Sequence, residues 1–322
     1  MESLENHLRQ LRRLEPPAGK VDLVMDTDTY NEVDDQFAVV YALMAPEKIN
    51  LEAIYAAPFF NSRSTGPEDG MEKSYVEIHQ LLERMKIRRD RFVFRGSRTY
   101  LPDCRTPVES PAVDDLIRRA MDPARTAPLY VAAIGAITNI ASALIKCPAL
   151  VDRIVLIWLG GQPYNLPSAN EFNLMQDVPA AQVVFDSGVP LIHIPCGNVA
   201  EHLRTSLSEL ELYVKGRGAI GDYLYQTVFG YSSDHFAWTK VIWDIATIAW
   251  LINPAWLPTE VVHAPHLAPD MTWGFDHHRH FIRVCTHADR DAVFRDLFTR
   301  LDGSLKENIP SKRVSGEKPR KL

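Results

Sequence analysis

The chain has 322 residues, with 41 acidic and 35 basic side chains and a formal charge of −6 at pH 7. A hydrophobic fraction of 46% and a charged fraction of 24% are typical of a globular protein with a sizeable core, which excludes wholesale disorder. No run approaches 18 uninterrupted apolar residues, and the first twenty residues lack the apolar stretch of a signal peptide, so we expect a cytoplasmic protein.

Short apolar runs that end at polar, glycine or proline residues recur along the chain and predict buried strands. They are residues 21–25, 51–57, 91–94, 129–134, 153–159, 190–195, 259–264 and 280–285. Most are separated by segments of helical length with helical apolar spacing, at 35–44, 71–85, 138–146 and 177–188. This alternation predicts an α/β fold with an open, mostly parallel sheet and helices on both faces.

No linker divides the body of the chain, so residues 1–303 are expected to form a single domain. Residues 204–243 contain a helical pattern without an adjacent strand and are interpreted as a possible helical cap. The segment 304–322 has six Lys/Arg and two Glu and no aromatic residue, which predicts a polar, disordered tail. The four cysteines are far apart in the sequence and are expected to be reduced.

Open parallel sheets bind ligands beyond the carboxyl ends of their strands, and the first strand runs into a cluster of acids. These are Asp26, Asp28, Glu32, Asp34 and Asp35, followed at once by an apolar helix. The carboxylates would repel one another unless their negative charge were compensated. The N–H groups at the start of a helix compensate part of it, and a hard cation such as Ca²⁺ or Mg²⁺ compensates more. The alternative is that Asp34 or Asp35 only caps the helix and the others are solvated turn residues.

Polar residues follow other strands as well, with Asn61 after the second and Asn165 and 170–173 after the fifth. Asn and Glu side chains can hydrogen-bond the vicinal hydroxyls of a sugar, and Phe172 could lie against its apolar face. The alternative is ordinary turn chemistry. Later, Asp244 precedes an apolar helix, where capping is again an open alternative.

Three segments together carry a resemblance to a known family. They are VMDTDTYNEVDDQFA (24–38), IGAITNIASAL (134–144) and LGGQPYNLPSANEFNLMQDVPAAQVVF (159–185). They resemble the opening Asp-x-Asp-Pro-Gly-x-Asp-Asp motif, the Gly-Pro-Leu-Thr-Asn stretch and the Glu-Phe-Asn-x-x-x-Asp-Pro-x-Ala-Ala block of the inosine-uridine preferring nucleoside hydrolase family. The resemblance implies a Rossmann-like nucleoside hydrolase fold over roughly residues 21–302.

The resemblance further implies an N-glycosyl hydrolase that splits a ribonucleoside or related N-riboside into ribose and free base. Ca²⁺ would be held at the bottom of a pocket by Asp28, Asp35, Asp244 and the backbone carbonyl of Ile134. Asp28 would be the catalytic base, taking a proton from a metal-bound water that attacks the anomeric carbon. The implied ribose-binding residues are Asp34, Asn61, Asn165, Glu171, Asn173 and Asp244. Asp26 is interpreted as a supporting residue.

The chain departs from the family pattern at several places. Between Asp28 and Asp34 the chain has five residues where the family has three, so the turn is expected to bulge and bring Tyr30, Asn31 or Glu32 into the pocket. Trp243 stands where many members have a His that can protonate the leaving base. His235, Tyr225 and Tyr231 are alternative acids, or they belong to the surface and to packing. Trp243, Phe59 and Phe60 would either stack on a base or belong to the core.

Two other functions are weighed against hydrolysis. One is a non-catalytic nucleoside- or ribose-binding protein that retains the metal site. The other is a phosphohydrolase of the haloacid-dehalogenase type, which Tyr30 disfavours because Thr or Val is expected at that place in its motif. Expected partners are a small-molecule substrate and, by resemblance, further copies in a homodimer or homotetramer, with no nucleic acid and no membrane.

Overall fold

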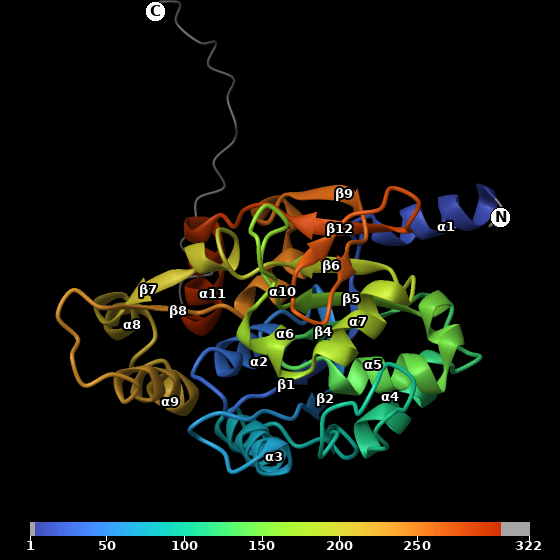
Figure 1. The fold of residues 1–322 in the computed structure, drawn as a ribbon. Coiled ribbons are helices and arrows are strands. Elements are labelled where there is room, and N and C mark those ends of the chain that lie inside the picture. The colour runs from blue at the N-terminus through green and yellow to red at the C-terminus, as the bar shows by residue number, and fades with distance from the viewer. Residues whose placement is uncertain (1–3, 304–322) are drawn as a thin grey trace, which may run out of the picture.

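The computed structural model describes residues 4–303, so the predicted tail at 304–322 lies outside the described residues. An eight-stranded sheet crosses the middle of the molecule, and helices pack on its two faces (Figure 1). In spatial order the strands are β3 (Val93–Arg95), β2 (Ile49–Ala56), β1 (Val21–Thr27), β4 (Leu129–Ala133), β5 (Ile154–Leu159), β6 (Leu191–Ile194), β12 (Phe281–Cys285) and β9 (Thr259–His263).

Each of the eight runs predicted as strands overlaps one of these strands. Neighbouring strands are parallel throughout except for the edge strand β9, which is antiparallel to β12. The predicted fold class, an open and mostly parallel sheet with helices on both faces, is therefore confirmed. In chain order, β2 and β3 are added on one side of β1. The chain then returns, and β4 and the later strands are added on the other side of β1. This reversal between β1 and β4 is the point where open α/β sheets form their ligand crevice.

Alternate residues of β1 point into two separate hydrophobic cores, one on each face of the sheet. Leu23 and Met25 belong to the first core and Val24 to the second. Helices that contribute to the first core are α2 (Asp35–Leu43), α3 (Pro67–Arg84), α8 (Leu207–Tyr213), α9 (Gly218–Phe229), α10 (Ile245–Ile252) and α11 (Arg290–Leu301). Helices that contribute to the second are α4 (Pro111–Ala120), α5 (Thr138–Lys146), α6 (Phe172–Gln176) and α7 (Val178–Asp186). The helix α1 (Leu4–Leu14) lies beside β12, where the Arg283 guanidinium donates to the Leu14 carbonyl.

A lobe projects from one side of the sheet and carries α8 and α9 (Figure 1). It is bounded by the antiparallel pair β7 (Arg204–Ser206) and β8 (Thr239–Val241). Helices therefore form in the 204–243 segment, as its sequence pattern predicted, but the expectation that no strand adjoins them is wrong, because β7 and β8 border them. The remaining short elements are η1 (Pro148–Asp152), η2 (Ala200–His202), η3 (Pro254–Trp256), β10 (His266–Leu267) and β11 (Trp273–Gly274). Within residues 4–303 no helix combines the length and apolarity needed to cross a bilayer.

Candidate active site

The acidic residues of the segment 26–35 follow β1, at the point where the order of the strands in the sheet reverses between β1 and β4. Asp26 belongs to β1 and is paired with Ala133 at the end of β4, so the residues that follow the two strands are neighbours. Asp28 comes directly after β1, and Gly135 comes two residues after β4. A Cβ atom on Gly135 would lie 2.9 Å from Cγ of Asp28, which means that a residue with a side chain would displace this carboxyl group. Glycine thus lets the carboxyl group of Asp28 lie against the end of β4.

The carboxyl group of Asp28 is buried, and neither of its oxygens has a hydrogen-bond partner among the described residues. Burial raises the pKa of Asp28 well above its usual value, and the nearby charges of Asp35 and Asp34 raise it further. A buried carboxylate without a partner is costly, so a native structure that contains one calls for a specific explanation. A bound cation is one such explanation.

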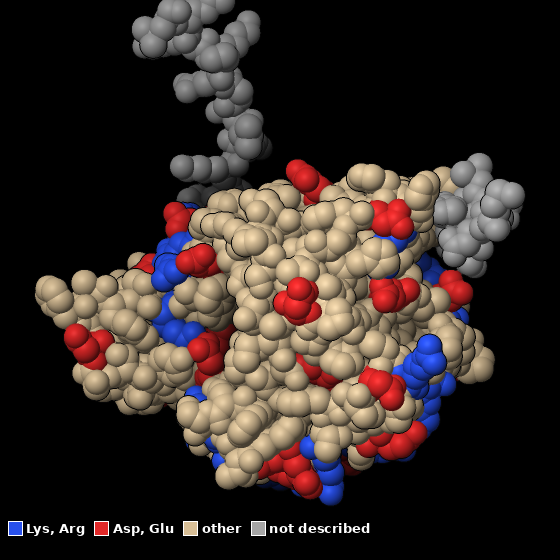
Figure 2. Space-filling model, in the orientation of Figure 1, with Lys and Arg blue, Asp and Glu red and all other residues tan. Residues whose placement is uncertain are grey.

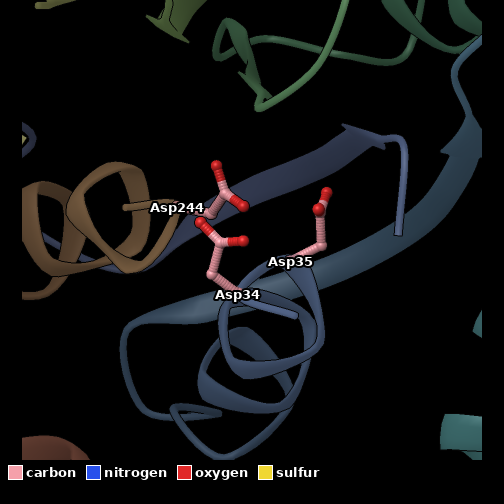
Figure 3. Close-up of side chains that lie close together, drawn as sticks. All are labelled: Asp34, Asp35 and Asp244. Atoms are coloured by element: carbon pink, nitrogen blue, oxygen red, sulfur yellow. The ribbon is translucent and has the colours of Figure 1, made fainter. Parts of the chain in front are cut away.

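Three further aspartates converge (Figure 3), and the charges of two of them, Asp35 and Asp34, act on Asp28. Asp34 and Asp35 come from the start of α2 and Asp244 from the residue before α10, and one carboxylate oxygen of each lies within 4.8 Å of the others. All three side chains are buried. Burial and the charge of Asp34 raise the pKa of Asp35 to about 8, and burial raises that of Asp34 to about 6 against the opposing charge of Lys240. Burial and the carboxylates of Asp34, Asp35 and Asp28 raise the pKa of Asp244 well above its usual value.

The helix-capping interpretation is wrong for Asp34 and Asp244. Both occupy the N-cap position of a helix, but neither side chain makes a capping hydrogen bond. Oδ2 of Asp34 instead accepts a hydrogen bond from the backbone N–H of Trp243 at 3.1 Å. The hydroxyl of Thr27 donates to Oδ1 of Asp35 at 2.5 Å. These contacts hold the acids toward one another, an arrangement that helix capping does not require.

The cluster fits a hard divalent cation. Its donors are carboxylate oxygens, which Ca²⁺ and Mg²⁺ prefer, and a cation would compensate both the mutual repulsion and the unpaired oxygens of Asp28. Asp26 is held apart from the cluster by Asn139, whose Nδ2 donates to Oδ1 of Asp26 at 2.7 Å. Burial raises the pKa of Asp26 to about 7 against this hydrogen bond.

A cavity of about 580 Å³ opens above the cluster, which is within the range of small-molecule sites. Of the residues that the sequence predicted for the site, it is lined by Asp34, Asp35, Asn61, Ile134, Glu171, Asn173 and Asp244. Phe172, Trp243 and Tyr231 line it too. Figure 2 shows acidic and basic side chains next to one another along the junction between the α8–α9 lobe and the rest of the molecule.

Glu171 is fixed by backbone donors from two directions. Its carboxylate caps α6 by accepting from the N–H groups of Asn173 and Leu174, and it also accepts from Gly161 at 2.7 Å. Burial raises the pKa of Glu171, while these backbone hydrogen bonds oppose the rise. The carboxylate therefore reaches the cavity with a defined orientation.

Two asparagines in the wall are similarly anchored. Nδ2 of Asn173 donates to the carbonyl of Leu159 at 3.0 Å. Asn61 donates to Oδ1 of Asn31 at 2.6 Å and accepts from the backbone N–H of Arg63 at 2.8 Å. Both side chains are thus oriented before any ligand binds, which lowers the entropy cost of recognition.

Asn165 is not brought to this cavity. It lines a second cavity instead, together with Pro163 and Tyr164. The hydroxyl of Tyr164 is 2.7 Å from Nδ1 of the buried His193 in β6, and the two rings are stacked. This contact draws the 163–165 segment away from the acidic cluster, so the family spacing of Asn165 does not translate into its expected place.

The long turn between Asp28 and Asp34 bulges into the cavity as expected. Asn31 and Glu32 line the cavity, whereas Tyr30 does not, because the Arg63 guanidinium lies over its ring at 4.5 Å from the centroid. Glu32 accepts from Lys240 at 2.6 Å and from Tyr231 at 2.7 Å. Although burial acts to raise the pKa of Glu32, the Lys240 ammonium outweighs it and the pKa lies below its usual value.

Of the three alternative acids, only Tyr231 lines the cavity. Tyr225 is buried against Phe229, and His235 is hydrogen-bonded to the Phe229 carbonyl outside the lining. Among the aromatic candidates, Trp243 lines the cavity. Phe59 is fully buried and Phe60 is 53% exposed, and neither contributes to the lining.

Several lining residues were not predicted from the sequence. Cys196 and Gly197 directly follow a predicted strand, so the same strand-end rule would have found them. Gln162, Arg63 and Glu201 carry no such signal. Gln162, for example, accepts from the N–H of Gly197 at 3.0 Å and donates to the Asn170 carbonyl, a bridge that only the folded chain shows.

The family model described as inosine-uridine preferring nucleoside hydrolase matches residues 23–295. A non-specific ribonucleoside hydrolase, RihC of Salmonella schwarzengrund, is 25% identical over 255 residues, which span 74% of this chain and 80% of that protein. An uncharacterized protein of Schizosaccharomyces pombe is 32% identical over 115 residues, covering 34% of this chain and 36% of that one.

Solved structures of the same class share the fold. A plant nucleoside hydrolase has a TM-score of 0.70 at 20% identity, with 88% of this chain and 99% of that chain covered. A purine-preferring ribonucleoside hydrolase from Gardnerella vaginalis has a TM-score of 0.69 at 19% identity, covering 89% and 99%.

Proposed function

The chain belongs to the inosine-uridine preferring nucleoside hydrolase family, and on this basis we propose that it hydrolyses the N-glycosidic bond of a ribonucleoside or related N-riboside with the aid of Ca²⁺. The family and the class of enzyme, an N-glycosyl hydrolase, agree with the expectation from the sequence motifs. The observation that carries the proposal is the buried carboxyl group of Asp28, which has no partner among the described residues and lies beside three converging aspartates.

Asp28, Asp35, Asp244 and the backbone carbonyl of Ile134 would hold the calcium ion. The grouping of carboxylate oxygens supports this donor set, as does the place of Ile134 in the wall of the same cavity. When bound, a divalent ion supplies an acidified and positioned water for attack on the anomeric carbon.

Asp28 is suited to act as the general base. Its carboxyl group is fully buried just beyond the end of β1, behind the residues that line the cavity, and neither oxygen has a hydrogen-bond partner among the described residues. A proton acceptor needs a free lone pair, and it must lie within reach of the attacking water. The oxygens of Asp28, which have no hydrogen-bond partner among the described residues, offer free lone pairs.

Asp34, Asn61, Glu171, Asn173 and Asp244 would bind the ribose hydroxyls. These side chains line one cavity, and most of them are already oriented by contacts to the backbone. N-glycoside cleavage develops positive charge on the sugar, as in the oxocarbenium-like state of glycoside hydrolysis. A ring of carboxylates would therefore stabilise the transition state more than the ground state, which is what accelerates a reaction.

The 204–243 segment would serve as a cap over the base half of the cavity within a single domain of residues 1–303. The placement of Tyr231 in the cavity wall supports this role. Assembly as a homodimer or homotetramer and location in the cytoplasm remain predictions.

Product analysis with a nucleoside panel tests the proposal. RihC is named a non-specific hydrolase, and the relative from Gardnerella vaginalis is named purine-preferring, so the panel should contain both purine and pyrimidine ribosides. We expect Ca²⁺-loaded protein to release free ribose and free base in equal amounts in phosphate-free buffer. Ribose that appears only as a phosphate ester when phosphate is added, or no ribose from any member of the panel, would contradict the proposal.

A further inference from the structure

The turn between Asp28 and Asp34 places the carboxylate of Glu32 in the cavity. Glu32 is partly exposed, whereas the aspartates of the cluster are buried. We propose that Glu32, held in place by Lys240 and Tyr231, selects the leaving base and favours bases that carry an exocyclic amino group. This inference rests on the proposed nucleoside hydrolysis and names a determinant of its substrate specificity.

The ion pair between Glu32 and Lys240 is asymmetric in its exposure. The Lys240 side chain is 8% exposed and that of Glu32 is 32% exposed, while their charged atoms are 2.6 Å apart. Lys240 does not line the cavity, whereas Glu32 does. The ammonium therefore supports the carboxylate from behind, and a ligand in the cavity meets a negative acceptor.

The backbone of the turn is held as firmly as the side chain. The guanidinium of Arg63 donates to the carbonyl of Glu32 at 2.9 Å, and Asn61 donates to Oδ1 of the neighbouring Asn31. Asn31 also donates its N–H to the carbonyl of Asp28 at 2.7 Å. Arg63, Tyr231 and Lys240 thus bond to Glu32 directly, and Asn61 holds the neighbouring Asn31, so Glu32 can discriminate between ligands without the cost of ordering a loop.

Depth in the cavity assigns Glu32 to the base. The aspartates that would hold the metal and the sugar are at most 4% exposed. Tyr231 is 43% exposed, and Glu32 and Trp243 are intermediate, so these three lie nearer the mouth of the cavity than the metal cluster does. A ribose that extends from the metal cluster to Asn61 and Glu171, which are intermediate too, would direct its base toward the other lining residues near the mouth, among them Trp243 and Glu32.

A carboxylate accepts hydrogen bonds and donates none. Oε1 of Glu32 accepts from Tyr231 and Oε2 from Lys240, and each oxygen has a further lone pair available for a ligand. An amino group on the base would supply a donor in addition to any ring N–H that the base carries, whereas a carbonyl oxygen or a bare ring nitrogen would face a negative charge without a proton between them. The charged hydrogen bond and this repulsion both favour amino bases.

Two pairs of nucleosides that differ by one amino group give the test. Guanosine differs from inosine, and adenosine from purine riboside, by the 2-amino and 6-amino group respectively. We expect the wild-type protein to prefer the amino member in at least one pair by about tenfold in kcat/KM, the effect of one charged hydrogen bond. Glu32→Gln should remove most of this preference, by lowering kcat/KM of the amino member and raising that of the other member, because an amide keeps the size of the side chain, carries no charge and can donate a hydrogen bond.

Tyr231→Phe provides a second variant that leaves the carboxylate in place but removes one of its supports. It should weaken the preference in the same direction and by a smaller factor. Glu211→Gln is the matched control, because Glu211 is exposed, pairs with Lys215 at 2.8 Å and lies on α8 outside the cavity. It should keep the wild-type ratio. Thermal melting of each variant shows that it is folded.

The possible outcomes separate this inference from the proposed function. If ribose is released but Glu32→Gln retains the wild-type ratios, or loses activity equally on all four substrates, Glu32 does not select the base and the inference is overturned. If the wild-type protein releases no ribose from any of the four, the proposed function itself fails and the inference fails with it.

Discussion

Asp34 and Trp243 are 209 positions apart in the chain and are joined by a hydrogen bond from the backbone N–H of Trp243 to Oδ2 of Asp34 at 3.1 Å. The bond connects the start of α2 to the residue that precedes Asp244, and so it brings two of the three converging carboxylates together before a cation binds. Assembling buried like charges costs free energy, which the rest of the fold has to supply.

Calcium should stabilise the protein strongly. A ligand at one hundred times its dissociation constant adds about 2.7 kcal/mol to the free energy of unfolding, and here it would also relieve repulsion among the aspartates. Thermal melting in EGTA and in millimolar Ca²⁺ measures the effect, with Asp244→Asn as the comparison. We expect a clear rise in Tm for the wild-type protein and a much smaller one for the variant. Equal rises would place the calcium site elsewhere.

The metal-free protein should lose stability as the pH rises. Burial and neighbouring charges raise the pKa values of Asp34, Asp26 and Asp35 to about 6, 7 and 8, against a usual value of 3.8. A group whose pKa is higher in the folded state binds protons more tightly there, so its stabilising contribution is complete below the unfolded value and is lost as the pH passes the folded one. Melting in EGTA should therefore give a Tm that falls between about pH 4 and pH 8.

Calcium should largely remove this pH dependence, because a bound cation favours the ionised carboxylates and lowers their pKa values. The same melting series in saturating Ca²⁺ should give a Tm that changes little from pH 6 to pH 8. A metal-free Tm that rises over the same range would contradict the raised pKa values.

Asn165 and Asn173 should differ in their importance for activity. Asn173 lines the cavity above the aspartates, whereas Asn165 lines the second cavity beside Tyr164. Replacing Asn173 with Ala should lower kcat/KM about tenfold or more, the usual cost of a lost hydrogen bond in a binding site, and Asn165→Ala should lower it less than about threefold. A large loss for Asn165→Ala, with Tm unchanged, would show that the 163–165 segment moves into the site when substrate binds.

Features of the fold and the site that depend on neighbouring residues in the chain could be predicted from the sequence. Apolar runs such as 129–134 identified the strands of the sheet, and the rule that ligands bind beyond strand ends located Asp34 and Asn61 in the cavity wall. The strand β9 was predicted at 259–264, but its antiparallel direction was not, because its composition resembles that of the parallel strands and its direction is set by the chain path between β9 and β12.

The remaining features of the site depend on contacts between distant residues. Glu32 and Lys240 are 208 positions apart, and no spacing in the sequence pairs them. Asn165 has the family spacing, but the stacking of Tyr164 on His193 determines where its side chain lies. A motif fixes which residues are present, and tertiary packing decides which of them reach the cavity.

The release of ribose by the Asp28→Asn variant tests the central claim most directly. The variant removes the proposed base while keeping the size of the side chain, and Asp22→Asn is its control because Asp22 lies near the opposite end of β1 and pairs with Arg125. We predict that Asp28→Asn lowers kcat by about two to four orders of magnitude with a Tm no lower than that of the wild-type protein, and that Asp22→Asn changes kcat little. Wild-type rates of ribose release from folded, calcium-loaded Asp28→Asn would contradict the account.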